Sequence, residues 1–288
     1  MRPFDFSAPA SLDEAVALLR RFGSSASLFA GGTDLLVEIK EQIRQPGHVI
    51  DLKRIPGLET LAFDAARGLE IGALVKVRDL ETSALVQRHH RGLWQAAREL
   101  GSIQVRNRAT LAGNVCRASP SADTLPPLVT DGATVHVHGP QGARAVAAEA
   151  FFTAPGRTVL APDEIVTRFT LPAPAANTGR AYLKHGRRKA MELATVGVAV
   201  SLAMRGDGAV HDVRIVLGAV APTPLRARAA ESLLEGRVPD ATRLDEAAAA
   251  AAAESRPISD VRASAAYRRR MVGVLVKRAV LQALENIR

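Results

Sequence analysis

The chain has 288 residues, of which 47% are hydrophobic and 23% charged, as in ordinary globular proteins, and its length predicts roughly two structural units. No apolar run approaches the roughly 18 residues of a membrane span, and the N-terminal residues lack a signal-peptide core, so we expect a cytoplasmic protein. The single cysteine, Cys116, excludes an internal disulfide and any iron–sulfur or zinc site built from thiolates. The formal charge of +9 favours anionic partners: nucleic acid, a nucleotide cofactor or an acidic protein.

The first 52 residues predict helices and short strands in alternation. Ser11 and Glu14 form a capping-box pattern that begins a helix, and Gly23 ends it. Within this helix an apolar stripe recurs at helical spacing, formed by Leu12, Ala15, Val16 and Leu19. The apolar runs that follow predict a strand over 27–30, a helix over 35–40 and a strand over 48–52.

The middle of the chain continues with short elements and then becomes polar. We expect a strand over 69–72, helices over 77–86 and 93–100, and strands over 134–138 and 165–171. From Gly101 to Thr124 the composition is rich in Ser, Asn, Gly, Arg and Pro and has no helical period. We interpret this stretch as a long, ordered functional loop, because structureless loops of that length are uncommon inside domains.

The sequence Pro-Ala-Pro-Ala-Ala-Asn at 172–177 is typical of a linker. Beyond it we expect strands over 179–183, 196–204 and 213–220, and then helices over 226–234, 244–254 and 263–287. Strands followed by helices in one block indicate an α+β domain.

The residues Gly31-Gly32-Thr33-Asp34 stand between a predicted strand and a predicted helix. Adjacent glycines allow left-handed backbone and close approach of a ligand, and successive amides beside a helix start suit a phosphate. The spacing is neither that of a Rossmann site nor that of a P-loop. Two interpretations remain open: a phosphate-binding loop, or a plain turn in which Asp34 caps the helix.

A second glycine-centred segment lies in the polar stretch, at Thr110-Leu111-Ala112-Gly113-Asn114. It offers a hydroxyl, a permissive glycine and an amide within five residues. Asp123 follows nine residues later, where an aspartate either caps a helix or accepts hydrogen bonds from ribose hydroxyls. Taken together, the two loops suggest an extended dinucleotide with its pyrophosphate over backbone amides.

The remaining chemistry-bearing residues form no recognisable catalytic or metal site. The seven histidines show no metal-ligand spacing, although His136 and His138 share the face of a predicted strand. No Gly-x-Ser-x-Gly elbow is present. We interpret the basic runs 187–189 and 268–270 as solvated faces or subunit contacts, and Cys116 as a small buried residue.

Three segments fall in order across almost the whole chain. The first is Leu28-Phe29-Ala30-Gly31-Gly32-Thr33-Asp34-Leu35. The second runs from Val105-Arg106-Asn107 through Thr110-Leu111-Ala112-Gly113-Asn114 to Ala118-Ser119-Pro120 and Ala122-Asp123. The third comprises Tyr182-Leu183-Lys184, Arg187-Arg188-Lys189-Ala190-Met191 and Glu192-Leu193-Ala194. Together they resemble FAD-binding subunits of molybdenum hydroxylases, the family that includes the medium subunits of aerobic carbon monoxide dehydrogenase and xanthine dehydrogenase.

The resemblance implies a fold and its boundaries. The expected α+β fold is a two-part FAD-binding domain of the vanillyl-alcohol oxidase type, followed by a smaller α+β domain with an antiparallel sheet and helices. The FAD-binding domain would cover 1–175, with subdomains of about 1–57 and 58–175, and the C-terminal domain would cover 178–288.

The resemblance also implies cofactor contacts for FAD. Ala30 to Asp34 would surround the pyrophosphate. Further matched positions in the first loop are Leu28, Phe29 and Leu35. Thr110, Gly113 and Asn114 would contact the phosphates and ribityl chain, Asp123 would lie on the adenosine side, and Leu100 and Gly101 would lie along the cofactor. Val166 and Lys184 complete the set, with Lys184 a candidate to stabilise the negative charge of reduced flavin.

The family further implies an electron-transfer subunit with no catalytic residue and no metal of its own. Its partners would be a small subunit with two [2Fe–2S] clusters and a large molybdopterin subunit, arranged as a dimer of heterotrimers. Some relatives carry an extra iron–sulfur cluster in this subunit, which the single Cys116 excludes here. The family often has Asp where this chain has Glu192.

Two alternative functions remain. One is a self-contained flavoenzyme on the same fold. The other, suggested by charge alone, is a nucleic-acid-binding module, but the sequence has no RNP-type motif and only 4% aromatic residues. Neither the substrate of the complex nor the electron acceptor is encoded in a recognisable motif.

Overall fold

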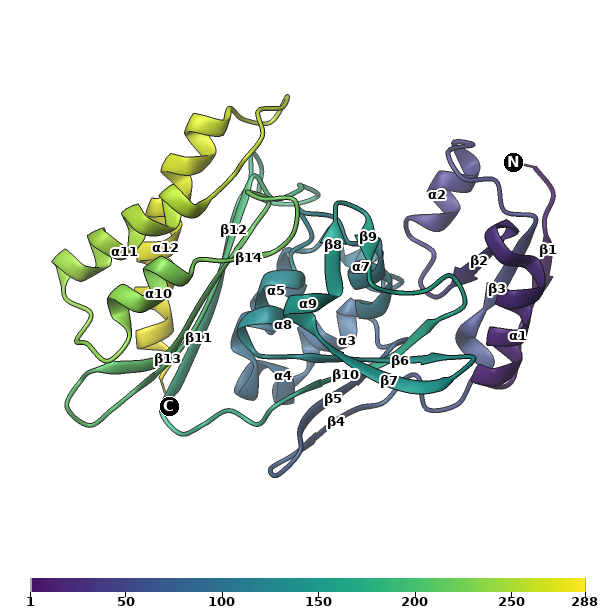
Figure 1. The fold of residues 1–288 in the computed structure, drawn as a ribbon, viewed down its shortest axis with the longest axis horizontal. Helices are drawn as coiled ribbons and strands as arrows, with labels where there is room; N and C mark the ends of the chain where they lie inside the picture. The colour runs from purple at the N-terminus through teal and green to yellow at the C-terminus, as the bar shows by residue number, and fades with distance from the viewer. Residues whose placement is uncertain (1, 288) are drawn as a thin grey trace.

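The computed structural model describes residues 2–287, which form three larger sheets arranged in chain order and a two-stranded ribbon (Figure 1). The first is a parallel three-stranded sheet of order β1-β3-β2. Ser11 accepts a hydrogen bond from the Glu14 amide at the start of its first helix, and Gly23, at a φ of 54°, ends that helix as predicted. The elements are β1 (Asp5–Ser7), α1 (Leu12–Phe22), η1 (Gly23–Ser25), β2 (Ala26–Phe29), α2 (Leu35–Lys40), β3 (His48–Asp51) and η2 (Leu52–Arg54).

The second sheet is antiparallel, has five strands in the order β4-β5-β10-β6-β7, and forms the centre of the molecule (Figure 1). Its strands are β4 (Leu61–Asp64), β5 (Gly68–Gly72), β6 (Thr134–Gly139), β7 (Gly142–Ala147) and β10 (Ile165–Leu171). A two-stranded ribbon joins β8 (Phe152–Ala154) to β9 (Arg157–Thr158). The helices of this part are α3 (Val77–Thr82), α4 (Ala84–His89), α5 (Arg91–Glu99), α6 (Ile103–Arg106), α7 (Leu111–Arg117), α8 (Leu125–Thr130) and α9 (Ala148–Phe151).

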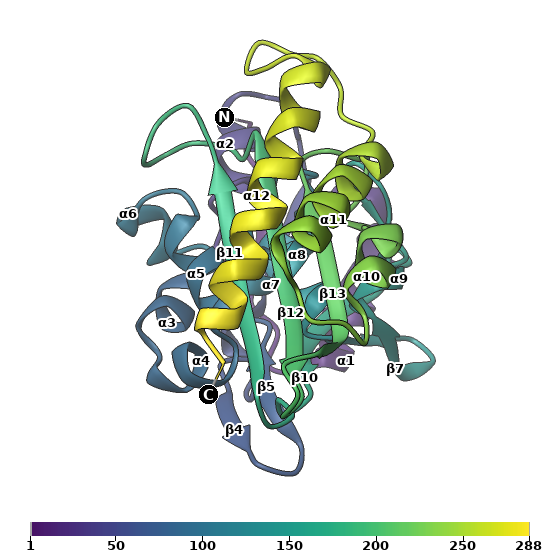
Figure 2. The ribbon, with the colours of Figure 1, turned by 90° about the vertical axis from the view of Figure 1, so that its left-hand side faces the viewer.

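The third sheet is antiparallel in the order β11-β12-β13-β14, and three helices cover its outer face (Figure 2). Its other face packs on α5 and α8 of the central part. In the central strand β12 every residue except the last is buried, because layers of helices cover both faces of the sheet. The elements are β11 (Thr178–His185), β12 (Val196–Met204), β13 (Val210–Gly218), β14 (Leu225–Arg226), α10 (Arg228–Leu234), α11 (Ala241–Glu254) and α12 (Ala265–Glu285).

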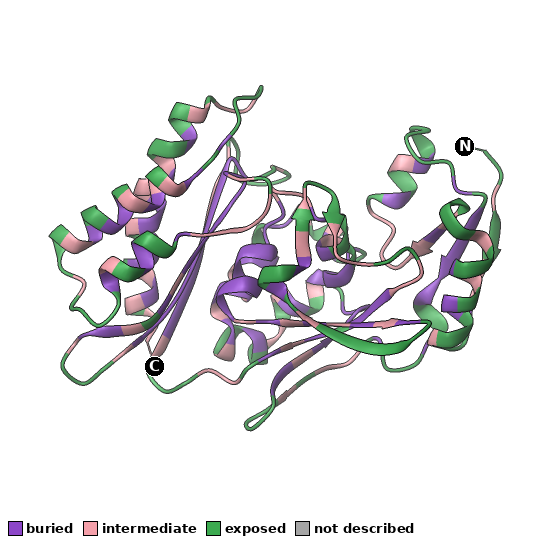
Figure 3. Ribbon diagram, viewed as in Figure 1, coloured by how far each residue is buried: buried purple, intermediate pink, exposed green. Residues whose placement is uncertain are grey.

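Two hydrophobic cores account for most of the buried apolar residues (Figure 3). One extends from α1 through the central sheet, and the other lies between the C-terminal sheet and its helices. No helix within residues 2–287 is both long and apolar enough to cross a bilayer.

Two predictions about local structure were wrong. The helix expected over 77–86 is divided at Ser83, whose extended backbone ends α3 and whose hydroxyl caps α4 by accepting from the Val86 amide. The stretch 101–124 is not one irregular loop, because it contains α6 and α7. Ser102 and Thr110 begin these two helices by side-chain capping.

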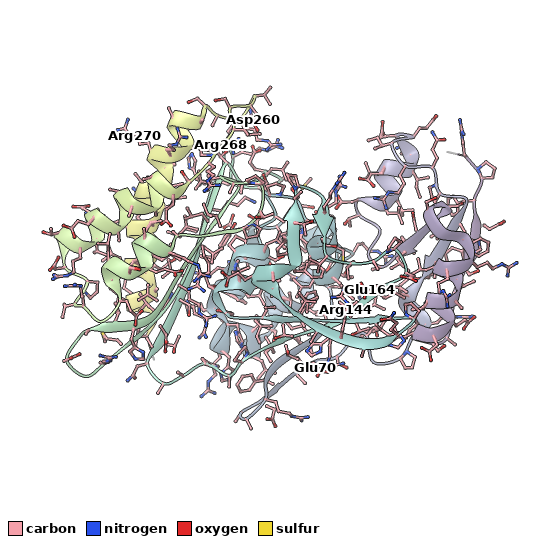
Figure 4. The ribbon with its side chains drawn as sticks, viewed as in Figure 1. Glu70, Arg144, Glu164, Asp260, Arg268 and Arg270 are labelled. Carbon is pink, nitrogen blue, oxygen red and sulfur yellow. The ribbon has the colours of Figure 1, made fainter. Side chains whose placement is uncertain are left out.

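Arg268 was expected on a solvated face or at a subunit contact, and this was wrong because the side chain is buried inside the chain. Its side chain is 2% exposed and donates hydrogen bonds to the carbonyl oxygens of Thr195 and Ala219, at 2.8 and 3.2 Å. It also forms an ion pair with Asp260 at 2.7 Å, which partly balances its buried charge. Figure 4 shows Arg268 beside Asp260, whereas the exposed Arg270 lies on the outer side of α12.

Candidate functional site

The turn between β2 and α2 presents a run of free backbone amides. Within the described chain, the N–H groups of Gly31, Gly32, Thr33 and Asp34 donate no hydrogen bond. Gly32 has a φ of 75°, which an L side chain rarely adopts. Successive free amides in such a turn form a concavity that suits an anion. Asp34 precedes α2 but its side chain makes no capping bond, so the capping interpretation of this residue was wrong.

The first loop packs directly on the second. A Cβ atom added to Gly31 would lie 2.1 Å from the carbonyl oxygen of Arg108, so the two backbones touch here and leave no room for a side chain. An ion pair holds the following helices together, because Arg117 Nη2 of α7 lies 2.9 Å from Glu38 Oε1 of α2. Segments about 75 residues apart thus form one surface.

The second loop begins α7. Thr110 Oγ1 accepts from the amide of Gly113 at 3.0 Å, and Gly113 itself is exposed. Asn114 Oδ1 accepts from the hydroxyl of Thr124 at 2.6 Å, which fixes the side-chain amide of Asn114. The residues expected to meet phosphate and ribityl groups therefore lie together at the start of one helix.

Asp123 joins the central part of the chain to the C-terminal sheet. Its Oδ1 accepts from the Tyr182 hydroxyl at 2.8 Å, and its Oδ2 accepts from Lys184 Nζ at 2.9 Å. It does not cap α8, so the capping alternative was wrong; Thr124 occupies that position. Burial raises the pKa of Asp123 to about 6 despite the ammonium of Lys184.

Tyr182 is a member of this cluster that lies in the third matched segment but was not among the predicted cofactor contacts. Its ring is 3% exposed, and burial together with Asp123 raises the pKa of its hydroxyl well above the usual value. Tyr182 and Lys184 are two residues apart on β11, and residues at this spacing share one face of a strand, here the face turned toward Asp123. That spacing is the sequence signal that would have found Tyr182.

Lys184 also borders a cavity of about 540 Å³ that the loop after β11 lines with Arg187, Arg188 and Lys189. These three side chains are exposed, as predicted. Glu192 lies 3.4 Å from Arg188 Nε and 3.7 Å from Arg187 Nε, so its carboxylate offsets part of the positive charge of the loop. The cavity therefore remains electropositive.

Three predicted positions lie at the margins of this region. Gly101, at a φ of 53°, follows α5, and its carbonyl accepts from the amide of Met191 at 3.3 Å. The carbonyl of Leu100 accepts from Arg106 Nη1 at 2.9 Å. Val166 is 4% exposed within β10 and packs in the main core, so little besides its backbone is available to a ligand.

Comparison with known proteins identifies the family. Residues 2–174 match the family described as the FAD binding domain in molybdopterin dehydrogenase, and residues 181–283 match the CO dehydrogenase flavoprotein C-terminal domain. The chain belongs to the molybdopterin dehydrogenase FAD-binding subunits. This confirms the resemblance found in the sequence and the predicted fold class.

The relatives of this FAD-binding subunit match it over nearly its full length. It is 38% identical to the carbon monoxide dehydrogenase medium chain of Hydrogenophaga pseudoflava, over 96% of both chains. It is 30% identical to the xanthine dehydrogenase FAD-binding subunit of Escherichia coli O157:H7, over 98% of this chain and 97% of the relative. Among solved structures, a carbon monoxide dehydrogenase from Hydrogenophaga pseudoflava that lacks the Mo-pyranopterin moiety superposes with a TM-score of 0.95 at 39% identity, covering 100% of both chains. Quinoline 2-oxidoreductase from Pseudomonas putida 86 gives 0.92 at 30% identity, covering 99% and 98%.

The side chains and backbone of this FAD-binding subunit fit the cofactor of its family. The free amides at 31–34 suit a pyrophosphate, and Gly113 is exposed beside the second loop, where a Cβ would meet Thr110 Oγ1 at 3.1 Å. Within residues 2–287 no three His, Cys, Asp or Glu side chains are grouped to hold a metal ion. His136 instead bonds Thr170, and His138 bonds Asp13. Cys116 is exposed as a residue, whereas burial of its thiol raises the pKa of that group to about 12, so the prediction of a buried residue holds for the thiol alone.

Proposed function

We propose that this subunit carries FAD between the [2Fe–2S] clusters of a small partner subunit and an external electron acceptor, within a molybdenum hydroxylase whose large subunit holds molybdopterin. Support comes from relatives named as medium chains and FAD-binding subunits of dehydrogenases, which match the whole chain. The observation that carries the proposal is the four free amides at 31–34 packed against the second loop. We further propose a dimer of heterotrimers as the assembly.

We assign the pyrophosphate of FAD to the first loop, with Ala30 to Asp34 around it and Leu28, Phe29 and Leu35 as flanking contacts. The amides there donate no hydrogen bond within the described chain, so they can donate to an anion without breaking an internal bond. Lys53 Nζ lies 3.8 Å from the centre of the Phe29 ring and 2.6 Å from Asp51 Oδ1, so the ammonium beside this loop is paired with a carboxylate.

The second loop and the C-terminal strand complete the proposed site. Thr110, Gly113 and Asn114 would face the phosphates and ribityl chain. Asp123 uses one lone pair of each oxygen internally, so each oxygen can still accept from a ribose hydroxyl. Leu100, Gly101, Val166 and Lys184 would line the rest of the cofactor.

Bound FAD supplies the electron-transfer chemistry, and the chain supplies its position and electrostatic surroundings. The ammonium of Lys184 is held by Asp123 and by the carbonyl of Glu99, at 2.9 and 3.0 Å. Its position is therefore fixed, while its charge is shared with a carboxylate. We propose that the division of the chain follows these roles, with an FAD-binding domain over 1–175, subdomains of about 1–57 and 58–175, and a C-terminal domain over 178–288.

The proposed function is tested on the complex isolated gently from its native host. We expect one releasable FAD per copy of this chain, and a large and a small subunit in equal amounts. Rapid mixing with the substrate of the complex should bleach the flavin absorbance only when all three chains are present. A flavin-free complex, or full turnover by this chain alone, would contradict the proposal.

A further inference from the structure

A second cavity, of about 450 Å³, lies at the other end of β11. We call it the arginine cavity, because Arg88, Arg91 and Arg180 line it together with His89, Thr178 and Asn286. No aspartate or glutamate is among its lining residues. Thr178 and Lys184 are separated by six residues of strand, or about 20 Å, so this cavity is distinct from the proposed flavin site.

The cavity is built where the linker meets both halves of the molecule. It involves the end of α4, the start of α5, residues 174–178 and the C-terminal Asn286. Figure 2 shows the C-terminal end of the chain next to α4, and Asn286 lines the cavity together with residues of that helix. Asn286 Nδ2 donates to the carbonyl of Arg180 at 3.0 Å, and Thr178 Oγ1 donates to the carbonyl of Ala175 at 2.8 Å. The walls are therefore held by internal hydrogen bonds.

Arg180 supplies a fixed and nearly buried guanidinium. Its residue is 9% exposed, and its Nε donates to Asp131 Oδ1 at 2.7 Å. The other oxygen of Asp131 lies 2.8 Å from Nδ1 of the buried His90. A single carboxylate thus serves two groups, and within residues 2–287 the Nη2 of Arg180 has no hydrogen-bond partner.

Arg91 contributes a donor that is buried without a partner. Its Nε is shielded from solvent and makes no hydrogen bond within the described chain. Its guanidinium lies 5.9 Å from the centre of the Trp94 ring, and among residues 2–287 it forms no ion pair. An unpartnered buried donor of this kind costs free energy unless a ligand or water accepts from it.

His89 lies beside the arginines of the cavity and is partly buried. Burial lowers the pKa of His89, and the charges of Arg88, His90 and Arg180 lower it further. The imidazole stacks on the Phe63 ring at 3.8 Å, which fixes its plane. A neutral, oriented imidazole can donate or accept one hydrogen bond to a polar ligand.

We propose that the arginine cavity binds a small phosphate-bearing molecule. Guanidinium groups present paired N–H donors that match the oxygens of a phosphate, and three of them face one cavity here. The volume exceeds that of a phosphate ion alone and lies in the range of small-molecule sites, so a phosphate monoester fits better than the free ion. Such a ligand would link α5 to β11, the strand that carries Tyr182 and Lys184 to Asp123.

The test uses the full chain saturated with FAD, so that the flavin loops are filled. Melting temperature is followed during titration with orthophosphate and, separately, with glycerol 3-phosphate, at constant ionic strength kept with chloride. We expect a saturable rise of roughly 2 to 4 °C at ten times the dissociation constant. Arg91→Gln and Arg88→Gln should each weaken binding by about tenfold or more, the loss of one charge-assisted contact.

Arg270→Gln is the matched control, because Arg270 is exposed on α12 and loses the same charge outside the cavity (Figure 4). It should bind phosphate like the wild type. Tighter binding of glycerol 3-phosphate than of orthophosphate supports an organic phosphate as the ligand, and equal affinity supports the shared phosphate chemistry alone. No saturable rise, or the same response in the Arg91→Gln, Arg88→Gln and Arg270→Gln proteins, would overturn the proposal. Either result leaves the FAD proposal unaffected, because flavin occupancy is measured separately.

Discussion

Replacing Gly31 by alanine tests the contact between the two loops on which the proposed FAD site depends. The added Cβ would lie 2.1 Å from the Arg108 carbonyl oxygen, 2.9 Å from its carbon and 3.0 Å from the Ala109 Cα. All three are backbone atoms, so no side-chain rotation relieves the contact. The second loop must retreat by about 1 Å to reach an ordinary separation.

Such overpacking costs about 1–3 kcal/mol. In a cofactor that contacts both loops, the hydrogen bonds to its charged groups would become longer or less linear, and each such bond contributes about 1.5–3 kcal/mol. We therefore expect Gly31→Ala to raise the dissociation constant of FAD by about 10- to 100-fold. The measurement is fluorescence titration of the apoprotein with FAD, with circular dichroism and melting temperature recorded in parallel.

Gly206→Ala is the control, because a Cβ at Gly206 meets no atom within 4 Å. It should bind FAD like the wild type. If Gly31→Ala folded and bound FAD with unchanged affinity, the close approach of the two loops would have no part in cofactor binding. If its melting temperature fell while its FAD affinity held, the contact would serve only the fold.

Three further predictions concern the same region. Gly32→Val adds a branched side chain at a φ of 75° and a Cβ 2.2 Å from the Phe29 ring, so FAD occupancy measured by absorbance should fall to near zero. The control is Gly156→Val, which lies at a φ of 70° with open space around it and should retain FAD. Equal FAD occupancy in the two variants would refute the placement of the pyrophosphate at the first loop. Lys184→Met should lower the flavin midpoint potential in a redox titration, and more at pH 5.5 than at pH 8. At pH 5.5 Asp123 is protonated in both proteins, whereas at higher pH the loss of the ammonium raises the pKa of Asp123, and the proton it retains replaces part of the lost positive charge. Unchanged potentials would remove Lys184 from flavin electrostatics. Native Asp123 keeps its proton up to about pH 6 while the unfolded chain releases it near pH 4, so stability falls as pH rises through this window. In urea unfolding, the advantage of the wild type over Asp123→Asn should therefore shrink by about 2–3 kcal/mol between pH 4 and 7, and a constant or growing advantage would contradict the raised pKa.

The first loop was predictable because its signals are local. Residues 35–40 form a helix as expected, and the strand before them differs from the prediction by one residue at each end. The caps at Ser102 and Thr110 are equally local, but each begins a helix of only four or seven residues, too short for an apolar period to appear. The polar composition of 101–124 therefore led to the prediction of a loop in place of these two helices. The edge strand β7 was not predicted for a related reason, because five of its six residues are exposed and show no alternation of apolar and polar side chains.

Arg268 shows what sequence patterns omit. Three consecutive arginines on a helix are typical of a solvated surface, and two of the three residues are exposed. The acceptors of the third are carbonyls of Thr195 and Ala219, at sequence separations of 73 and 49 residues. They lie at the ends of β12 and β13, where strand pairing no longer uses them. Burial of this charge is therefore a property of the tertiary fold, and helical spacing alone does not reveal it.

The contacts of Asp123 argue that the C-terminal sheet is part of the proposed flavin site and more than an appendage to it. The carboxyl group belongs to the segment after the second loop, yet its partners Tyr182 and Lys184 are on β11, 59 and 61 residues away. Without that strand the carboxylate would be left without its donors beside the proposed ribose position, at the desolvation cost of an unpaired group. Ala219, at the end of β13, adds a hydrogen bond from its amide to the carbonyl of Pro120 at 2.7 Å. The geometry of the second loop therefore depends on the docking of the C-terminal sheet, and any ligand or partner that tightens this docking should strengthen FAD binding.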